Sequence, residues 1–517
     1  MMNNMKKRFA KCTTVKPLQV LFLATAALLS GCDKSADTEQ TGATDSATHK
    51  QPNIIVLFTD DMGYGDLSSY GSATNDTPEL DEMAREGQRW TDFYVAAPIC
   101  SPSRGALMTG NYPERSGLYG KTKGVLFPGE PGRIPDATVT MPEALKSAGY
   151  DTVMFGKWHL GDLPDALPTR HGFDEWLGVP YSNDMDWAVG PTSPEIFAHG
   201  AKGDKAFVRQ AIADRKTYTL HPKNEYWDIP LIKSSVVADG YEDKIVERPP
   251  NQSLLTKRYT EESINYIEQH AHGEKPFFLY LAYSMPHAPI FASEAFQGKS
   301  AGGRYGDVVE EIDWSVGQIR KALEAQGIAE DTLLVFSSDN GPWTLMDQHS
   351  GSSGPLKGGK GTTFEGGLRV PGIFWWPGHI EPKVVHGMGS VMDLYATALS
   401  LAGAEPAASV VDSIDLSPTL LQGEDSPRTR QAFYRSGELY AFRKGPYKIH
   451  LITQGSYGMP PARTEHKRPL LYHLGEDPKE QFNLAEERPE VLADMLKAVE
   501  LHRSGMQIAE SIFEIGR

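Results

Sequence analysis

Cysteine, long apolar runs and positive charge are all scarce in this chain of 517 residues. Its three cysteines are Cys12, Cys32 and Cys100. Outside the N-terminus, no stretch of the sequence is both long and apolar enough to span a bilayer, which argues against a membrane helix there. With 51 basic and 67 acidic residues the formal net charge is −16, which argues against nucleic acid as a partner. An anionic substrate would therefore have to be attracted by a local site.

The N-terminus has the pattern of an export signal. Basic residues precede the apolar run at residues 18–29, and small residues follow it. A cleaved signal peptide over residues 1–31 is favoured over a membrane anchor, because the run is too short to cross a bilayer.

The end of this signal predicts a lipid anchor. Leu29-Ser30-Gly31-Cys32 resembles a bacterial lipobox, which implies lipidation of Cys32 and an exported, periplasmic or cell-surface lipoprotein held at a membrane. Asp33 resembles an inner-membrane retention signal. Residues 32–52 are polar and low in complexity, so they are expected to form a flexible tether.

These assignments leave Cys100 as the single unmodified cysteine of the mature chain, with no disulfide partner in an oxidising compartment. A lone cysteine is usually a small buried hydrophobic residue. Cys100 instead lies in the polar, basic stretch PICSPSR, residues 98–104, which favours a functional role.

The composition, 40% hydrophobic and 23% charged, is that of a soluble globular protein, and its apolar runs predict an α/β fold. Runs rich in β-branched and aromatic residues are typical of buried parallel strands, and helical patterns separate them. The predicted strands are residues 54–59, 152–155, 276–283 and 332–337, and the predicted helices are 77–87, 140–149 and 305–326. Beyond them, short alternating patterns and a helical run at 489–505 predict an antiparallel sheet with a helix. We expect a catalytic α/β domain over 53–415 and a smaller α+β domain over 416–517.

Acidic and amide side chains follow two of the predicted strands. Asp60 and Asp61 follow the first strand, and Asp339 and Asn340 follow the fourth. The carboxyl ends of the strands form the ligand crevice of an open α/β sheet, so we expect these side chains to converge. One such pair alone would more often form a turn or a helix cap. Two pairs of hard oxygen donors favour a Ca²⁺ or Mg²⁺ site.

Basic side chains follow the other two strands. Lys157 and His159 follow the second and His287 the third, while Lys360 lies in the glycine-rich stretch KGGKGTTFEGG. Each alone could be a solvated surface group. Together with a metal they would form a cationic pocket suited to a sulfate or phosphate ester. Cys100 precedes a short helix candidate, and a helix N-terminus is a favourable place for a nucleophile that attacks an anionic ester.

Several motifs together resemble one enzyme family. Cys100-Ser101-Pro102-Ser103-Arg104 matches the C-x-P-x-R signature of type I sulfatases, and GALMTGNYPERSGL continues it. The family's other blocks follow in its order, over about residues 52–517, as NIIVLFTDDMGYGDL, GKWHLG, PHAP, SSDNGPW and GKGTTFEGGLRVPG. The sequence is most similar to the arylsulfatase A and N-acetylgalactosamine-6-sulfatase branch. The resemblance implies an alkaline phosphatase-like fold, in which helices sandwich a large mixed sheet, with a smaller C-terminal α+β domain.

The resemblance also implies a modified nucleophile. A formylglycine-generating enzyme would oxidise Cys100 to Cα-formylglycine, whose hydrate carries two hydroxyls. One would attack sulfur and form a covalent sulfo-enzyme, and deprotonation of the other would expel sulfate. A serine lacks that second hydroxyl, so it could accept the sulfate but could not release it.

Further roles follow from matching positions. The resemblance implies one calcium ion, with its ligands at Asp60, Asp61, Cys100, Asp339 and Asn340. It implies that Arg104 and Lys157 hold the hydrate and that His159 is the base. His287 and Lys360 would bind the sulfate, and one of them would protonate the leaving oxygen.

The expected function is hydrolysis of sulfate from a carbohydrate of the galactan or glycosaminoglycan type. The alternatives are a broad arylsulfatase, a phosphodiesterase or phosphonate hydrolase of the alkaline phosphatase superfamily, and a lipoprotein that binds sulfated glycans without hydrolysing them. Residues 181–250 are expected to hold substrate-contacting loops, whose aromatic residues Trp187, Tyr226 and Trp227 either stack on sugars or cover a loop core. His466 and the ITQGSYG segment, residues 452–458, are expected to approach the pocket from the second domain.

Overall fold

The computed structural model describes residues 50–515, and from Lys50 onward the chain forms one compact unit. The predicted signal peptide, Cys32 and most of the predicted tether lie outside the described residues. Within residues 50–515, no helix is both long and apolar enough to cross a membrane.

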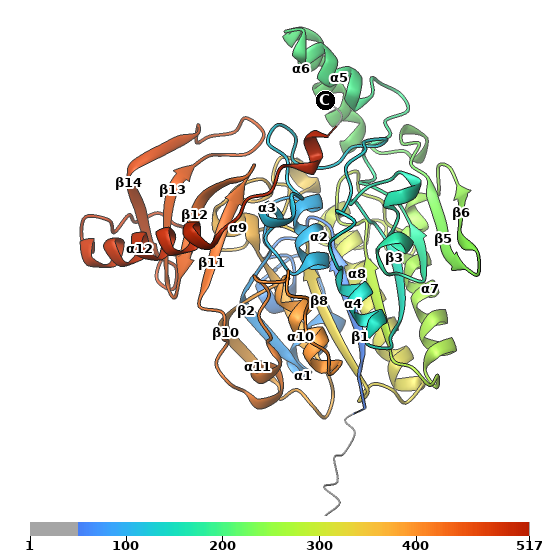
Figure 1. The fold of residues 1–517 in the computed structure, drawn as a ribbon. Helices are drawn as coiled ribbons and strands as arrows, with labels where there is room; N and C mark the ends of the chain where they lie inside the picture. The colour runs from blue at the N-terminus through green and yellow to red at the C-terminus, as the bar shows by residue number, and fades with distance from the viewer. Residues whose placement is uncertain (1–49, 516–517) are drawn as a thin grey trace, which may run out of the picture. The chain divides into compact units, whose positions relative to one another are not determined.

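A large mixed sheet runs through the described part of the chain (Figure 1). Its centre consists of the four strands expected from the apolar runs, which pair in parallel. In spatial order they are β8 (Thr332–Ser338), β1 (Asn53–Thr59), β7 (Phe277–Ala282) and β3 (Asp151–Gly156). Every residue of β1, β7 and β8 is buried, which explains why these strands are continuous apolar runs rather than alternating ones.

Further strands extend this sheet at both sides. Next to β8 lie β9 (Arg369–Trp375), β2 (Gln88–Tyr94) and β10 (Lys383–Ser390), and β9 is antiparallel to both of its neighbours. Next to β3 lies β4 (Glu175–Gly178), followed by the antiparallel hairpin β5 (Leu231–Val237) and β6 (Gly240–Glu247). The sheet is therefore mixed, as expected.

Helices cover both faces of the large sheet, and alternate side chains of β1 pack against the helices on opposite faces. Ile55 and Leu57 belong to one hydrophobic cluster, and Ile54, Val56 and Phe58 to another, because successive side chains of a strand point to opposite faces. The first cluster includes side chains of α1 (Pro78–Glu86), α7 (Leu255–His270) and α8 (Gly303–Ala325). The second includes side chains of α2 (Cys100–Thr109), α4 (Met141–Ser147) and α10 (Asp393–Leu401). The sandwich of helices around a mixed sheet is confirmed.

The C-terminal part forms a smaller antiparallel sheet with its own core (Figure 1, orange to red). Its strands are β11 (Arg430–Arg435), β12 (Glu438–Lys444), β13 (Tyr447–Thr453) and β14 (Thr464–His473), and α12 (Pro489–Gly505) packs on them. This α+β arrangement is the expected one. Leu416 and Leu420, at the start and inside of α11 (Ser417–Gln422), pack in the core of the large sheet, and the boundary at residue 415 stays a prediction.

Residues 181–250 contain regular structure where loops were expected. They include α5 (Ser193–Ala201) and α6 (Lys205–Leu220) as well as the hairpin β5–β6. Trp187 and Trp227 are buried and belong to the main core, and the Trp187 ring packs 5.7 Å from that of Tyr218. These two indoles therefore fill the interior and are not available to stack on a sugar.

Candidate active site

The candidate site residues lie at the carboxyl ends of the parallel strands. Asp60 and Asp61 directly follow β1, and Lys157 and His159 follow β3. His287 follows β7, and Asp339 and Asn340 follow β8. Neighbouring parallel strands bring these four segments to one edge of the sheet, so the convergence expected from the sequence is present.

The acidic group is fully buried and internally connected. The Asp61 backbone N–H donates to Asp339 Oδ1 at 3.1 Å, and Asn340 Nδ2 donates to Asp61 Oδ1 at 2.7 Å. Asp61 has a φ of 66°, a left-handed conformation that is uncommon for residues other than glycine, although aspartate adopts it more often than most, and that accompanies the turn of the chain after β1. The buried Asn340 Oδ1 has no hydrogen-bond partner among the described residues. The Asn340 side-chain oxygen is thus available to bind a ligand.

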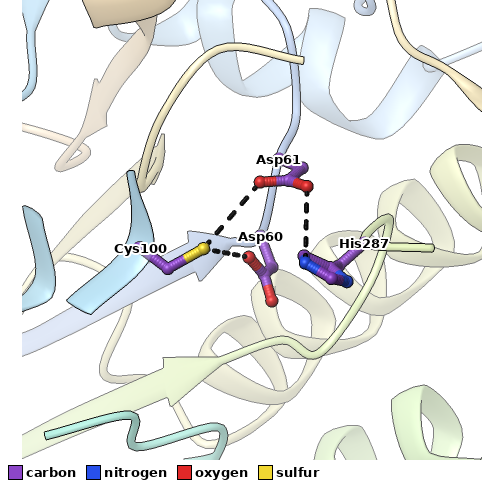
Figure 2. A group of neighbouring side chains, drawn as sticks. All are labelled: Asp60, Asp61, Cys100 and His287. Carbon is purple, nitrogen blue, oxygen red and sulfur yellow. Dashed lines mark hydrogen bonds and ion pairs between the residues drawn. The ribbon is translucent and has the colours of Figure 1, made fainter. Parts of the chain in front are cut away.

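Cys100 lies against these carboxylates (Figure 2). It is the first residue of α2, and its Sγ lies 3.4 Å from Asp60 Oδ1 and 4.0 Å from Asp61 Oδ1. Burial, and then the nearby Asp339 carboxylate, raise the pKa of this thiol well above its usual value. A thiol in this position stays protonated near neutrality, so unmodified Cys100 is a poor nucleophile.

Three cationic side chains surround the same group. Lys157 Nζ lies 2.5 Å from Asp60 Oδ2, and Lys360 Nζ lies 2.7 Å from Asp61 Oδ1. Arg104 Nε donates to Asp339 Oδ2 at 2.9 Å. Burial alone would raise the pKa of Asp60, but Lys157 and further cationic neighbours hold it well below its usual value.

The two histidines are buried and uncharged. Burial and the neighbouring Lys157 hold the pKa of His159 well below its usual range, and burial with Lys360 lowers that of His287. His159 Nε2 lies 3.1 Å from the carbonyl oxygen of Leu126, which assigns the proton to Nε2 and leaves the buried Nδ1 as a free acceptor. His287 Nδ1 lies 2.7 Å from the Ala288 carbonyl oxygen, and its Nε2 lies 3.6 Å from Asp61 Oδ2 (Figure 2). Both imidazoles can therefore accept a proton.

The arrangement fits a hard cation beside an anionic group. Possible ligand atoms of Asp60, Asp61, Cys100 and His287 all lie within 4.8 Å of one another. Three carboxylates and the unpartnered Asn340 oxygen are the donors that Ca²⁺ or Mg²⁺ prefers. The lysines and Arg104 at the edge of this group add positive charge for an oxyanion.

Comparison with known proteins decides the family. The sulfatase family profile matches residues 52–404, and that of the C-terminal region of aryl-sulfatase matches residues 426–517. The chain belongs to the sulfatase family. N-acetylgalactosamine-6-sulfatase of Mus musculus is 38% identical to it, over 96% of this chain and 92% of the relative. Arylsulfatase A of Bos taurus is 39% identical, over 88% and 87%.

A solved structure shares the fold of this sulfatase. The crystal structure of Ps i-CgsB in complex with k-i-k-neocarrahexaose superposes with a TM-score of 0.68 at 28% identity, covering 89% of this chain and 94% of that one. The family match and the curated relatives establish the chain as a sulfatase, an enzyme that hydrolyses sulfuric esters. The predicted similarity to arylsulfatase A and N-acetylgalactosamine-6-sulfatase is confirmed.

The sequence analysis missed two residues of the candidate site, Ser182 and Trp343, and did not single out a third, Tyr457, within the ITQGSYG segment. Ser182 Oγ accepts a hydrogen bond from Lys157 Nζ at 2.7 Å. The Trp343 ring lies 5.4 Å from that of His287, and Lys360 Nζ lies 5.0 Å from the centre of the Trp343 ring. Tyr457, from the smaller sheet, packs 5.6 Å from Trp343. Ser182 comes shortly after β4, so the strand-end rule could have found it.

The ITQGSYG segment does approach the site, as expected, through Tyr457. His466 instead faces its own sheet, where its Nε2 lies 2.9 Å from Thr453 Oγ1. The sulfatase pocket is therefore completed from the C-terminal part by the segment between β13 and β14.

A buried ionic cluster joins the loop that carries Lys360 to the smaller sheet. Glu365 begins α9 (Glu365–Leu368), five residues after Lys360. Lys448 Nζ, from β13, lies 2.9 Å from Glu365 Oε1 and 3.1 Å from Glu480 Oε1, and it donates to the Thr363 carbonyl at 2.9 Å. Burial alone would raise the pKa of Glu365, but Lys448 and two arginines hold it at about 2. Lys448 is thus the cation that these two buried carboxylates share.

Replacing Lys448 with methionine is expected to lower the free energy of unfolding by about 3–5 kcal/mol, because it leaves two buried carboxylates without their common partner. Chemical denaturation measures the effect. The matched control is Lys444→Met on the neighbouring strand β12, where the exposed ion pair with Asp494 is worth at most about 1 kcal/mol. Equal losses in the two variants would contradict a special role for the buried cluster.

Proposed function

We propose that this sulfatase removes sulfate from a sulfated carbohydrate, with residue 100 as the nucleophile. The observation that carries the proposal is the position of Cys100, buried against Asp60 and Asp61 and surrounded by Lys157, Lys360 and Arg104. In an acidic chain, such a cluster is the local attraction that an anionic ester needs.

The nucleophile we propose is a modified Cys100. Its thiol has a raised pKa and would react poorly, whereas Cα-formylglycine at this position would supply a hydroxyl nucleophile in its hydrated form. A formylglycine-generating enzyme would act on the C-x-P-x-R sequence, in which Pro102 and Arg104 follow Cys100.

Asp60, Asp61, Asp339, Asn340 and residue 100 would hold one Ca²⁺. When bound, the ion would supply Lewis-acid stabilisation of a sulfate oxygen. The free Oδ1 of Asn340 and the close carboxylates support this ligand set.

The remaining side chains have distinct tasks in this proposal. Lys157 and Arg104 are held by Asp60 and Asp339 at the side of residue 100, where they would position its hydroxyls. Lys360 and His287 both contact Asp61, where they would bind the sulfate, and one of them, in its protonated form, would protonate the leaving oxygen. His159, uncharged and with a free Nδ1, would accept the proton whose removal releases sulfate.

Relatives support a carbohydrate as the substrate. One is an N-acetylgalactosamine-6-sulfatase, and the solved relative is a complex with a neocarrahexaose. We therefore propose a galactose-configured sulfate ester, of galactan or glycosaminoglycan type. The test is a panel of defined sulfated oligosaccharides assayed beside an aryl sulfate and a phosphate diester. Turnover dominated by the diester would refute the sulfate specificity, and hydrolysis of the aryl sulfate alone would refute the carbohydrate assignment.

We also propose that the enzyme is exported and anchored by lipid on Cys32, on the basis of the Leu29-Ser30-Gly31-Cys32 sequence. In the native host, the wild type is expected to sediment with membranes, and a Cys32→Ala variant is expected to be lost from that fraction because it has no acyl chain. Immunoblots of membrane and soluble fractions measure this. Equal membrane association of the two proteins would contradict the anchor.

A further inference from the structure

A cavity of about 230 Å³ lies beside the proposed sulfate site, between the large sheet's loops and the smaller sheet. Pro98 and Ile99, which directly precede Cys100, line one side of it, together with Gly361, which directly follows Lys360. Arg435 and Tyr457 line it from the C-terminal part. Two of the segments that line the cavity therefore also carry the proposed catalytic residues Cys100 and Lys360.

Arg435 brings an unpaired positive charge to this cavity. It is the last residue of β11, and its Nη1 donates to the Gly455 carbonyl at 2.9 Å. Within residues 50–515, no carboxylate forms an ion pair with Arg435: its hydrogen bonds there run from Nη1 to the carbonyl oxygens of Gln454 and Gly455, and its Cζ lies 6.0 Å from the centre of the Tyr440 ring. Burial lowers the pKa of this guanidinium from its usual value. A half-buried guanidinium without a carboxylate is costly unless a ligand provides the missing charge.

The acidic residue in the cavity does not cancel this charge near neutrality. Glu114, on α3 (Pro113–Ser116), is 2% exposed, and its Oε2 has no hydrogen-bond partner among the described residues. Burial raises the pKa of Glu114 to about 8. The protonated carboxyl can donate a hydrogen bond to an anion or to a sugar hydroxyl. Lys123, also in the wall, is paired with Glu130, so Arg435 supplies the uncompensated charge.

Aromatic rings connect the cavity to the sulfate site. Tyr457 is 48% exposed, and its ring packs 5.6 Å from that of Trp343, which in turn contacts His287 and Lys360. Ser456, next to Tyr457 and also in the cavity wall, lies against Gly361. A substrate bound at residue 100 could therefore extend past Tyr457 into the cavity.

We propose that this cavity is a second anionic subsite, in which Arg435 binds the sulfate or carboxylate group of the sugar next to the one that is desulfated. The inference rests on the proposed function. The planar guanidinium presents two parallel N–H donors, a geometry that matches carboxylate and other oxyanions. The volume is below the roughly 300 Å³ at which pockets for drug-sized ligands begin, which suits a single sugar unit and not a longer chain.

The experiment compares substrates that differ only in the neighbouring sugar. Arg435→Gln and wild type are assayed on 4-nitrophenyl sulfate and on disaccharides whose second sugar carries a sulfate, a carboxylate or no charge. Arg430→Gln is the matched control, because Arg430 is exposed at the opposite end of the same strand and does not line the cavity.

We expect Arg435→Gln to raise KM about 10- to 100-fold for the disaccharides with a charged neighbour, the range of a hydrogen bond to a charged group. For these disaccharides, kcat is expected to stay within about twofold of wild type. For the aryl sulfate and the uncharged disaccharide, both KM and kcat are expected to stay within about twofold, because neither substrate has an anionic group for Arg435 to bind. The charged neighbour with the larger KM effect, sulfate or carboxylate, identifies the preferred anion.

Equal losses on all substrates, or no loss on any, would overturn the subsite. So would a wild type that hydrolyses the aryl sulfate but no disaccharide with a charged neighbour. A wild type that hydrolyses no sulfate ester at all would instead overturn the proposed function, so the two failures are distinguishable.

Discussion

Replacement of Cys100 by alanine is expected to lower kcat by about 10⁴-fold or more, which is the order of effect seen when an enzyme loses its nucleophile. The side chain of residue 100 contacts Asp60 and Asp61 and lies close to Lys157 and Lys360. Steady-state hydrolysis of an aryl sulfate measures the loss, and circular dichroism shows whether the variant is folded.

Two further variants make this result specific. Ser103→Ala, on the same buried helix, removes a hydroxyl that has no hydrogen-bond partner among residues 50–515. It is expected to keep turnover within about tenfold of wild type, because the hydroxyl is not one of the reacting groups. Cys100→Ser is expected to accept one sulfuryl group from the substrate and then stop, because serine lacks a second hydroxyl. Intact mass after incubation with substrate detects this. More than a tenth of wild-type turnover in Cys100→Ala would contradict the assignment of the nucleophile.

Removal of the proposed Ca²⁺ ion is the second change for which we expect a large effect. A chelator is expected to lower kcat/KM by about 10³-fold, because several kcal/mol of transition-state stabilisation depend on the ion. Restored Ca²⁺ at about 100 times its dissociation constant is expected to return activity and to stabilise the fold by about 2.7 kcal/mol, since the ion binds the folded state. Activity assays and thermal unfolding with and without Ca²⁺ measure both effects.

The acidic residues near β1 provide the control for this effect. Asp61→Asn is expected to abolish the Ca²⁺-dependent rise in melting temperature, because Asp61 is a proposed ligand. Asp66→Asn should keep it, because the equally buried Asp66 carboxylate is bonded to the Tyr305 hydroxyl and to the backbone N–H groups of Gly63 and Ser352. Loss of the rise in both variants, or in neither, would contradict the proposed ligand set.

The centre of the fold and the members of the site could be predicted because local rules apply there. β1, β7 and β8 are buried on both faces, so their sequences are apolar runs, and polar residues directly after such runs must lie at the sheet edge. The sequence therefore predicts that Asp60, Asp339 and the residues next to them lie close together. Cys100 was recognisable because its surroundings, PICSPSR, are unusual for a buried cysteine.

The parts that could not be predicted depend on contacts between distant segments. Trp187 and Trp227 lie in a polar, aromatic-rich region, and only their packing under other elements reveals that they are core residues. Lys448 and Arg435 occupy ordinary strand positions, at which the sequence does not indicate whether a lysine or arginine is buried or lines a cavity. The contribution of the smaller sheet to the pocket was correspondingly underestimated.

The central claim, that residue 100 works as formylglycine, is tested most directly by the mass of one peptide. Trypsin releases residues 90–104 as a single fragment that contains Cys100. In active enzyme from the native host, we expect this fragment to carry an aldehyde in place of the thiol and to react with a hydrazide. A fully active preparation in which the fragment is entirely the unmodified cysteine form would contradict the account.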